Sequence, residues 1–532
     1  MNFTQFPLSR WRLEVFAIVV IAAALWMTLR SISDSNRASA RNYLEMSHFP
    51  KADSFFRFTP PTKIARLITE WEPQQALIMA VSFPEANANV DIADTTIQIL
   101  EVAYQYLEIY VFCEYEHTRE FAFFLARLEK HPEGAKILER THFIDSRNLM
   151  RWVRDFGPIF GVNRNKELVA IDLVYRNLMK DLESVALNKK DSFRDFMTLQ
   201  SDAMPADVVA MIEREYDIPV ALIRPPISMD GGDFVSDGKG NIFVSSQTLA
   251  RNGTNRQELQ KLFLNYLGAK KLHILEALPG ATVRHLDMIL KFANEKTILL
   301  PDYKVDKDYL INPYRIELSK KVQSVLQKNE SYLRKHFPKH TFLKIPMPPI
   351  LFLSEDEIFR QTKEEFYRVF VLDRDLLTSM EVDVLTPTQR QRMEKQVEGL
   401  VKKELPSADF QTEEGFDKIL HHFGQQTLES YVGLDAESVT RYRSYINSVF
   451  LHSKGRKQAY LIPRFTGKTE QENTLLKQWE KAVESVYRKV SPNANIHWIN
   501  CDSMVDEMGF LHCVTSTLPA IPIQNPGKPK SL

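Results

Sequence analysis

The sequence predicts an α/β fold. Short apolar runs of strand length recur along the 532 residues, and stretches with helical periodicity separate them. Regular alternation of strands and helices is typical of α/β proteins. One glycine-rich stretch, DGKGN at 237–241, joins GDFV to NIFV and predicts a β-hairpin. The runs expected to be strands are QALIMAVSF, EIYVFCEY, LVAIDLVY, PVALIRP, NIFVSS, KLHIL, TILLPD, AYLIPRF and IHWINC.

Composition indicates a large globular protein without a nucleic-acid partner. The chain is 44% hydrophobic, which is enough for a substantial core, and its length suits two or three domain-sized units. Lysine plus arginine and aspartate plus glutamate both number 68, so the net charge is zero. Non-specific binding of DNA or RNA needs a basic field that this balance does not provide.

The N-terminus carries a membrane signal. VFAIVVIAAALWMTL is uncharged from Val15 to Leu29, and Arg12 and Arg30 flank it. Its length lies between that of a signal-peptide core and that of a full membrane span. We expect residues 1–30 to be a retained signal anchor, with a cleaved signal peptide or an apolar helix of a soluble protein as alternatives. The polar residues 31–57 then form a tether, and the globular part is expected outside the cytoplasm.

The remaining chain divides by composition. Residues 58–353 and 440–532 carry the strand-like runs and are expected to form one α/β domain. Residues 354–439 are charged and helix-periodic, with Glu and Lys/Arg at helical offsets. They predict an inserted helical subdomain whose charges cover a solvated surface, with a dedicated partner-binding face as the alternative. The oligomeric state cannot be predicted.

The three cysteines do not form a recognisable framework. They are too few and too scattered for a set of disulfides, and no cysteine or histidine cluster has zinc-ligand spacing. The cysteines therefore predict neither a disulfide framework nor a zinc site. Cys113 and Cys501 lie in apolar, strand-like surroundings and are predicted to be buried thiols. Cys513, in GFLHC, is either a third packed thiol or a nucleophile, which requires a proton-transferring partner from elsewhere in the chain.

His285 is the best candidate for that partner. In RHLDM it alternates with Asp287, so in an extended strand both side chains would point to the same face. This spacing pairs a general acid/base with a carboxylate, although chance also produces it. His512 is expected to orient Cys513 and not to act as its base, because consecutive strand residues face opposite ways.

Two further stretches carry carboxylates beside glycines. In RWVRDFGP, Asp155 precedes a Gly-Pro turn that can hold the carboxylate at the mouth of a strand, although a surface Arg–Asp pair is the alternative. In DGGD, the paired glycines Gly231 and Gly232 allow other groups to approach the backbone closely, and Asp230 and Asp233 flank them. A plain loop is equally compatible with this second stretch, and calcium binding is a looser alternative, although the spacing is too short for an EF-hand.

Five motifs in order resemble one family. EWEPQQALIMA, RWVRDFGP, PPISMDGGDF, RHLDM and GFLHC together resemble the guanidine-modifying deiminases, above all agmatine deiminase and the Porphyromonas-type peptidyl-arginine deiminases. The resemblance covers roughly residues 58–300 and 440–520. It implies a pentein fold, in which ββαβ units surround a pseudo-fivefold axis and the active site lies at the centre.

The resemblance also implies residue roles. Cys513 matches the nucleophile and His285 the general acid/base, while Asp155 and Asp287 match the carboxylates that hold the substrate guanidinium. Asp230, Gly231 and Gly232 match the family's loop beside the active site, and Trp152 matches an aromatic residue just before the aspartate; these four residues are expected to contact the substrate. Arg176 is a candidate contact for a substrate carboxylate, with an exposed surface arginine as the alternative. The chain departs from many relatives at Arg284, where they have glycine, and at Asp230, where glutamate is commoner.

The implied activity is hydrolysis of a guanidino group. Carboxylates satisfy the planar fork of guanidinium N–H donors by bidentate hydrogen bonds, and a thiolate can attack the central carbon. The products are a ureido compound and ammonia, and we expect this route to need no metal and no organic cofactor. Agmatine and arginine-containing peptides remain open as substrates. Alternatives are a catalytically silent pentein scaffold that binds a partner, and an amidinotransferase.

Overall fold

The computed structural model describes twelve stretches of the chain. They are residues 58–61, 64–81, 90–113, 118–146, 150–175, 201–281, 283–304, 313–352, 387–424, 440–455, 457–505 and 509–520. The chain divides into two compact units, one made of residues 57–358 and 431–532 and the other of residues 1–56 and 359–430. The smaller unit contains the helices α16 (Pro387–Glu404) and α17 (Glu413–Gly424).

One arrangement of strands recurs in the larger unit. Two strands pair antiparallel, a helical segment follows, and the next strand pairs parallel to the second. In the first sheet the order is β1-β5-β6-β7, and α10 precedes β7. These elements are β1 (Ile64–Leu67), β5 (Ile159–Asn163), β6 (Leu168–Ile171), α10 (Met204–Tyr216) and β7 (Ala221–Ile223).

Three more sheets repeat this arrangement. The first is β8 (Val235–Ser236), β9 (Asn241–Ser245) and β10 (Lys271–Leu275), with α11 (Ser246–Arg251) and α12 (Arg256–Leu267). The second is β11 (Lys291–Asn294), β12 (Thr297–Asp302) and β13 (Thr341–Pro346), with α13 (Pro313–His336). The third is β16 (Val449–His452), β17 (Gln458–Arg464) and β18 (Asn495–Asn500), with α18 (Glu470–Val490). Antiparallel pairing of β8 with β9 confirms the predicted hairpin.

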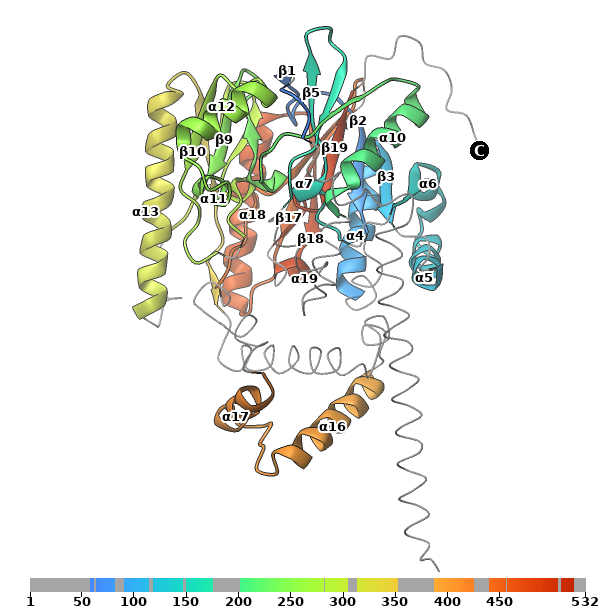
Figure 1. Cartoon of the computed structure of the whole chain (residues 1–532), viewed down its shortest axis with the longest axis vertical. Helices are drawn as coiled ribbons and strands as arrows, with labels where there is room; N and C mark the ends of the chain where they lie inside the picture. Colours follow the sequence, from blue (N-terminus) through green and yellow to red (C-terminus); the bar gives the residue numbers. More distant parts are fainter. Residues whose placement is uncertain are drawn as a thin grey trace, which may run out of the picture. The chain divides into compact units, whose positions relative to one another are not determined.

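The last strand closes the larger unit by pairing with an early one. β19 (Thr515–Pro519) runs antiparallel to β2 (Gln74–Ala80), which is followed in the sheet by β3 (Glu108–Cys113) and β4 (Thr141–Asp145) (Figure 1). The helices of this part are α4 (Val90–Ala103), α5 (Thr118–Glu129) and α6 (Gly134–Glu139). A two-stranded sheet joins β14 (Leu351–Phe352) to β15 (Thr440–Arg441). The pairing of β19 with β2 brings Cys513, which precedes β19, next to residues near the start of the domain.

Local sequence explains where helices begin and end. α12 starts after Asn255, whose side chain accepts hydrogen bonds from the backbone N–H groups of Gln257 and Glu258. It ends at Gly268, which has φ +63° and provides the left-handed conformation that closes a helix. β2 and β3 are buried along nearly their whole length, as expected for parallel strands covered on both faces. The predicted α/β class is confirmed.

The two structural cysteines lie where the sequence places them. Cys113 ends β3 and Cys501 follows β18, and both are fully buried free thiols. In the described part of the chain, no helix combines the length and hydropathy that crossing a membrane requires. The apolar segment 15–29 lies outside the described residues, so the membrane prediction stays a prediction.

Candidate functional site

The predicted site residues meet where several short segments converge. They come from the helix α7 (Val153–Phe156), the 3-10 turns η1 (Gly231–Asp233) and η2 (Leu286–Met288), and the turn 511–514 before β19. None of these segments is long, so the sheets behind them fix their positions. Cys513, His285, Asp287 and Asp155 are all brought together here.

His285 lies between two carboxylates. Its Nε2 is 3.1 Å from an oxygen of Asp230, and its Nδ1 is 3.4 Å from an oxygen of Asp155. The extended strand on which the same-face argument for RHLDM depended is not present: His285 has extended backbone, but a 3-10 turn begins at Leu286. The turn is held by the carbonyl of Leu286, which accepts the N–H groups of the two residues after Met288. Contacts from neighbouring segments, not strand alternation, therefore direct His285 and Asp287 into the same site.

The paired glycines are required by close packing. A Cβ atom at Gly232 would lie 2.6 Å from Nδ1 of His285 and 2.9 Å from an oxygen of Asp155. A Cβ atom at Gly231 would lie 2.1 Å from the carbonyl oxygen of Arg154. The backbone N–H of Gly232 also donates to Asp155 over 3.2 Å. The loop thus lies directly against the site, and its contact with a substrate stays a prediction.

Asp230 and Asp233 differ in their surroundings. Asp230 accepts both terminal N–H groups of Arg251, at 2.6 and 2.9 Å, in addition to its contact with His285. Burial alone would raise the pKa of Asp230, but the hydrogen bond of His285 and the charge of Arg251 hold it well below the ordinary value. Asp233 accepts from the backbone and hydroxyl of Ser245 at the start of α11. Asp230 therefore holds His285, whereas Asp233 is a structural residue.

Cys513 is buried beside a carboxylate and an amide. Its side chain is 3% exposed, and its Sγ lies 3.6 Å from Asp287 and 3.4 Å from the amide nitrogen of Asn447. Burial raises the pKa of this thiol, and the negative charges of Asp287 and Asp155 raise it further. Without a bound cation the thiol is therefore held in its protonated form.

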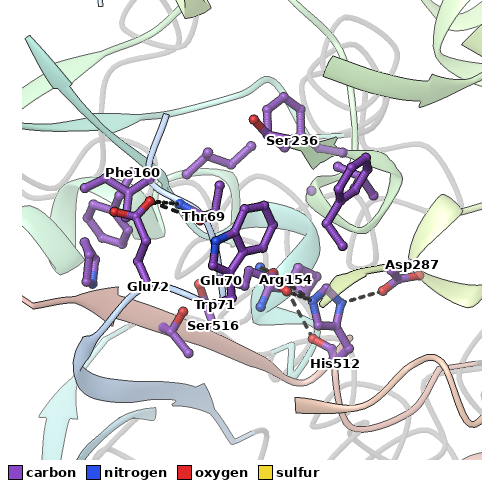
Figure 2. A pocket seen from close by; sticks show the side chains of 18 of the residues that line it. Thr69, Glu70, Trp71, Glu72, Arg154, Phe160, Ser236, Asp287, His512 and Ser516 are labelled. Atoms are coloured by element: carbon purple, nitrogen blue, oxygen red, sulfur yellow. Dashed lines mark hydrogen bonds and ion pairs between the residues drawn. The ribbon is translucent and has the colours of Figure 1, made fainter. Parts of the chain in front are cut away.

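His512 bridges two carboxylates (Figure 2). Its Nδ1 is 2.8 Å from Asp287 and its Nε2 is 2.8 Å from Glu70. The expectation that His512 and Cys513 face opposite ways is wrong, because residues 511–514 form a turn and both side chains contact the same oxygen of Asp287. The other oxygen, Oδ1 of Asp287, is buried and has no hydrogen-bond partner among the described residues.

Glu70 connects the site to a cavity. Glu70, Arg154, Asp287 and His512 help to line a cavity of about 90 Å³ (Figure 2). Arg154 donates to Glu70 over 2.8 Å, and the amino group of Lys291 lies 3.6 Å from it. Partial desolvation would raise the pKa of Glu70, but the charges of Arg154 and His512 hold it well below the ordinary value.

Sequence reasoning missed Glu70, Asn447 and Arg251. Glu70 stands in the EWEP motif that carried part of the resemblance, so the motif itself was the available signal. Asn447 and Arg251 lie in RSYINS and TLARN, and neither stretch has a chemical pattern of its own. Only their contacts with Cys513 and Asp230 reveal them.

The remaining predicted residues lie around this centre or outside the described structure. Trp152 packs against Gly509, where an added Cβ would lie 2.2 Å from the indole ring, and the guanidinium of Arg151 lies 4.7 Å from the ring centre. Arg284 donates to the carbonyl of Ala281 over 2.9 Å. Arg176 lies outside the described residues.

The charges of the site suit proton donation and cation binding. Burial alone would lower the pKa of His285, but the charges of Asp155 and Asp230 outweigh it and raise the pKa to about 10. Burial raises the pKa of Asp155 to about 6, even though His285 opposes it. At neutral pH His285 is thus an imidazolium, and Asp155 and Asp287 are carboxylates. The described residues contain no group of three or more histidine, cysteine or acidic side chains arranged to hold a metal ion.

Comparison with curated proteins gives distant relatives of one kind. A protein named "Putative agmatine deiminase" from Legionella pneumophila (strain Paris) is 25% identical over 147 residues, which are 26% of this chain and 37% of that protein. A protein of the same name from Marinomonas sp. is 22% identical over 52% of this chain and 72% of its own length. The chain thus matches little more than a third of the length of the Legionella relative.

Solved structures share the fold. A structure titled as the putative arginine deiminase from Porphyromonas gingivalis has a TM-score of 0.51 at 16% identity, covering 85% of this chain and 98% of that one. One titled "C. Jejuni Agmatine Deiminase" has a TM-score of 0.50 at 15% identity, covering 85% of this chain and 95% of that one. A family model described as Porphyromonas-type peptidyl-arginine deiminase matches residues 66–519, so this chain belongs to that family.

Proposed function

We propose that this protein is a deiminase that hydrolyses the guanidino group of an arginine-type substrate to a ureido group and ammonia. One observation carries the proposal: a buried thiol, an imidazolium and two carboxylates share one small site. Within it, Oδ1 of Asp287 is buried and makes no hydrogen bond to the described residues, and Nδ1 of His285 has an ion-pair contact of 3.4 Å with Asp155 but no hydrogen bond. Buried polar atoms without a hydrogen bond are rare, so a bound ligand is expected to satisfy Asp287.

A guanidinium ion fits the charge of this site. Asp155 and Asp287 accept its N–H donors, and their negative charges make binding of the planar cation favourable. Cation binding also offsets the two charges that hold the thiol protonated, so it lowers the pKa of Cys513 and promotes thiolate formation. The nucleophile is therefore generated when the substrate is present.

The reaction proceeds in two balanced halves. The Cys513 thiolate adds to the central guanidinium carbon, His285 gives a proton to one amino group, and the C–N bond breaks to release ammonia. This leaves a thiouronium on Cys513. His285, now neutral, removes a proton from a water molecule as its oxygen adds to the same carbon, which restores the imidazolium. The C–S bond then breaks to free the thiolate, and the hydroxyl of the adduct gives its proton to the released ammonia as the ureido carbonyl forms.

We propose that this site lies at the centre of a pentein fold. In this arrangement the four sheets that share the strand pattern and the sheet β19-β2-β3-β4 surround a pseudo-fivefold axis. The repeating pairing pattern and the closure of β19 onto β2 support this arrangement. An experimental structure of the full chain would contradict it if the five sheets did not form a closed ring.

Ammonia release from the purified full-length protein tests the activity. Agmatine and peptides with internal or C-terminal arginine are offered separately, and both ammonia and the ureido product are measured. Cys513→Ser should abolish turnover, whereas Cys501→Ser removes an equally buried thiol away from the site and should preserve it. Product formation that requires an added amine would indicate an amidinotransferase. Silence with every guanidine would favour the scaffold alternative.

We further propose that residues 1–30 anchor the protein in a membrane, with the globular part outside the cytoplasm. The uncharged run from Val15 to Leu29 supports this location, and an extracytoplasmic enzyme would meet peptides more readily than agmatine. Cell fractionation tests it. Recovery of the full-length protein in the soluble fraction at low salt would contradict the anchor.

A further inference from the structure

Asn447 touches both residues of the His-Cys pair. It lies in the buried segment 442–448 before β16, and its side chain is fully buried. Its Oδ1 accepts the backbone N–H of His512 over 3.0 Å, and its Nδ2 lies 3.4 Å from Sγ of Cys513. Because the N–H of His512 can only donate, it fixes the orientation of the amide with the nitrogen toward the sulfur.

The carboxylates near the sulfur, Asp287 and Asp155, oppose its ionisation. When Cys513 is protonated, its thiol can donate to Asp287 over 3.6 Å. After ionisation the same contact places two negative charges side by side and becomes repulsive. The contact with Asn447 changes in the opposite sense, because a hydrogen bond to a charged acceptor is stronger than one to a neutral acceptor. The backbone of Phe510 also favours the thiolate.

We propose that Asn447 is a further catalytic residue, which stabilises the attacking thiolate by donating its side-chain N–H to the sulfur. This inference rests on the proposed deiminase reaction. An amide suits this position better than a lysine or arginine would. A cationic side chain there would stabilise the thiolate more strongly, but it would repel the guanidinium that must bind within reach of the same sulfur.

The test measures the reactivity of the thiol without any substrate. Full-length protein is treated with iodoacetamide across a range of pH, and the modified peptide containing Cys513 is quantified by mass spectrometry. Asn447→Asp keeps the size of the side chain and the acceptor for His512 but loses the donor. Asn447→Ala is uncharged and loses both. Asp287→Asn calibrates the assay, since removing its charge should make Cys513 more reactive at a given pH.

Both Asn447 variants should move the alkylation midpoint to higher pH and slow the reaction near pH 8 by about tenfold, the effect of losing one hydrogen bond to a charged group. With a guanidine substrate, kcat should fall more than KM rises, because the bond matters most when sulfur is charged. Alkylation of Cys113 and Cys501 in the same samples should not change. An unshifted profile for Asn447→Ala would overturn the proposal, and a shift in Asn447→Asp alone would identify charge repulsion as its cause.

Two further results keep the test decisive. If thermal unfolding shows that Asn447→Ala does not fold, Asn447→Leu, which is uncharged, close in size and has neither donor nor acceptor, replaces it and is judged by the same criterion. Failure of the proposed function is separable, because the alkylation profile requires no substrate. Shifted profiles in a protein that hydrolyses no guanidine would refute the deiminase, and with it a catalytic role for Asn447, but they would retain its interaction with the thiolate.

Discussion

Replacing Gly232 by alanine should inactivate the enzyme without unfolding it. The new Cβ would lie 2.6 Å from Nδ1 of His285, 2.9 Å from an oxygen of Asp155 and 3.3 Å from an oxygen of Asp287, whereas ordinary contacts of Cβ atoms begin near 3.4 Å. The methyl group therefore both occupies the centre of the site and displaces its charged groups by up to about 0.8 Å. Misplacement of reacting groups by about 1 Å costs about 100-fold in rate, so we expect kcat/KM to fall by about that factor.

The assay is steady-state ureido production at pH 7.5 with whichever guanidine the wild type hydrolyses. Gly399→Ala is the matched control, because an added Cβ at Gly399 contacts nothing within 4 Å and alanine favours the helix α16. It should retain wild-type activity. Activity of Gly232→Ala within threefold of wild type, at an unchanged melting temperature, would refute the packing argument.

Three predictions concern titration and buried charge. The value of kcat/KM should fall as the pH drops below about 6. Asp155, whose pKa is raised to about 6, then loses the negative charge that binds a guanidinium. A flat profile of kcat/KM from pH 5 to pH 7 would contradict this. Since burial disfavours ionised Asp155 in the folded state only, its cost is absent below pH 3.8 and complete above about 6. Asp155→Asn should therefore be inactive yet more stable by up to about 3 kcal/mol at pH 8 and no more stable at pH 4, as compared by thermal unfolding. Arg443 is fully buried and pairs with Glu472 over 2.6 Å, so Arg443→Met should destabilise the fold by about 3–5 kcal/mol, and the double variant with Glu472→Gln should recover part of this loss.

Asp230 illustrates how neighbours redefine a residue that a motif identifies. The sequence placed it beside the site as a substrate contact, and the structure brings it there. Its oxygens, however, already accept from Arg251 and His285. The raised pKa of His285 depends on this arrangement, so Asp230 acts on the proton donor. No motif contains this information, because Arg251 enters from the end of α11.

The sequence by itself determined the α/β class, the hairpin at 237–241, the buried state of Cys113 and Cys501, and the set of chemical residues around Cys513. The first three follow from local patterns, and the set of chemical residues follows from five motifs that occur in the order typical of the deiminases. Tertiary structure alone decided the pairing of His512 with Glu70 and Asp287, the contact of Asn447 with the thiol, and the position of Arg251. The reason is physical: these contacts join segments up to 442 residues apart, and their distances are set by how the sheets pack rather than by the spacing of residues along any one segment.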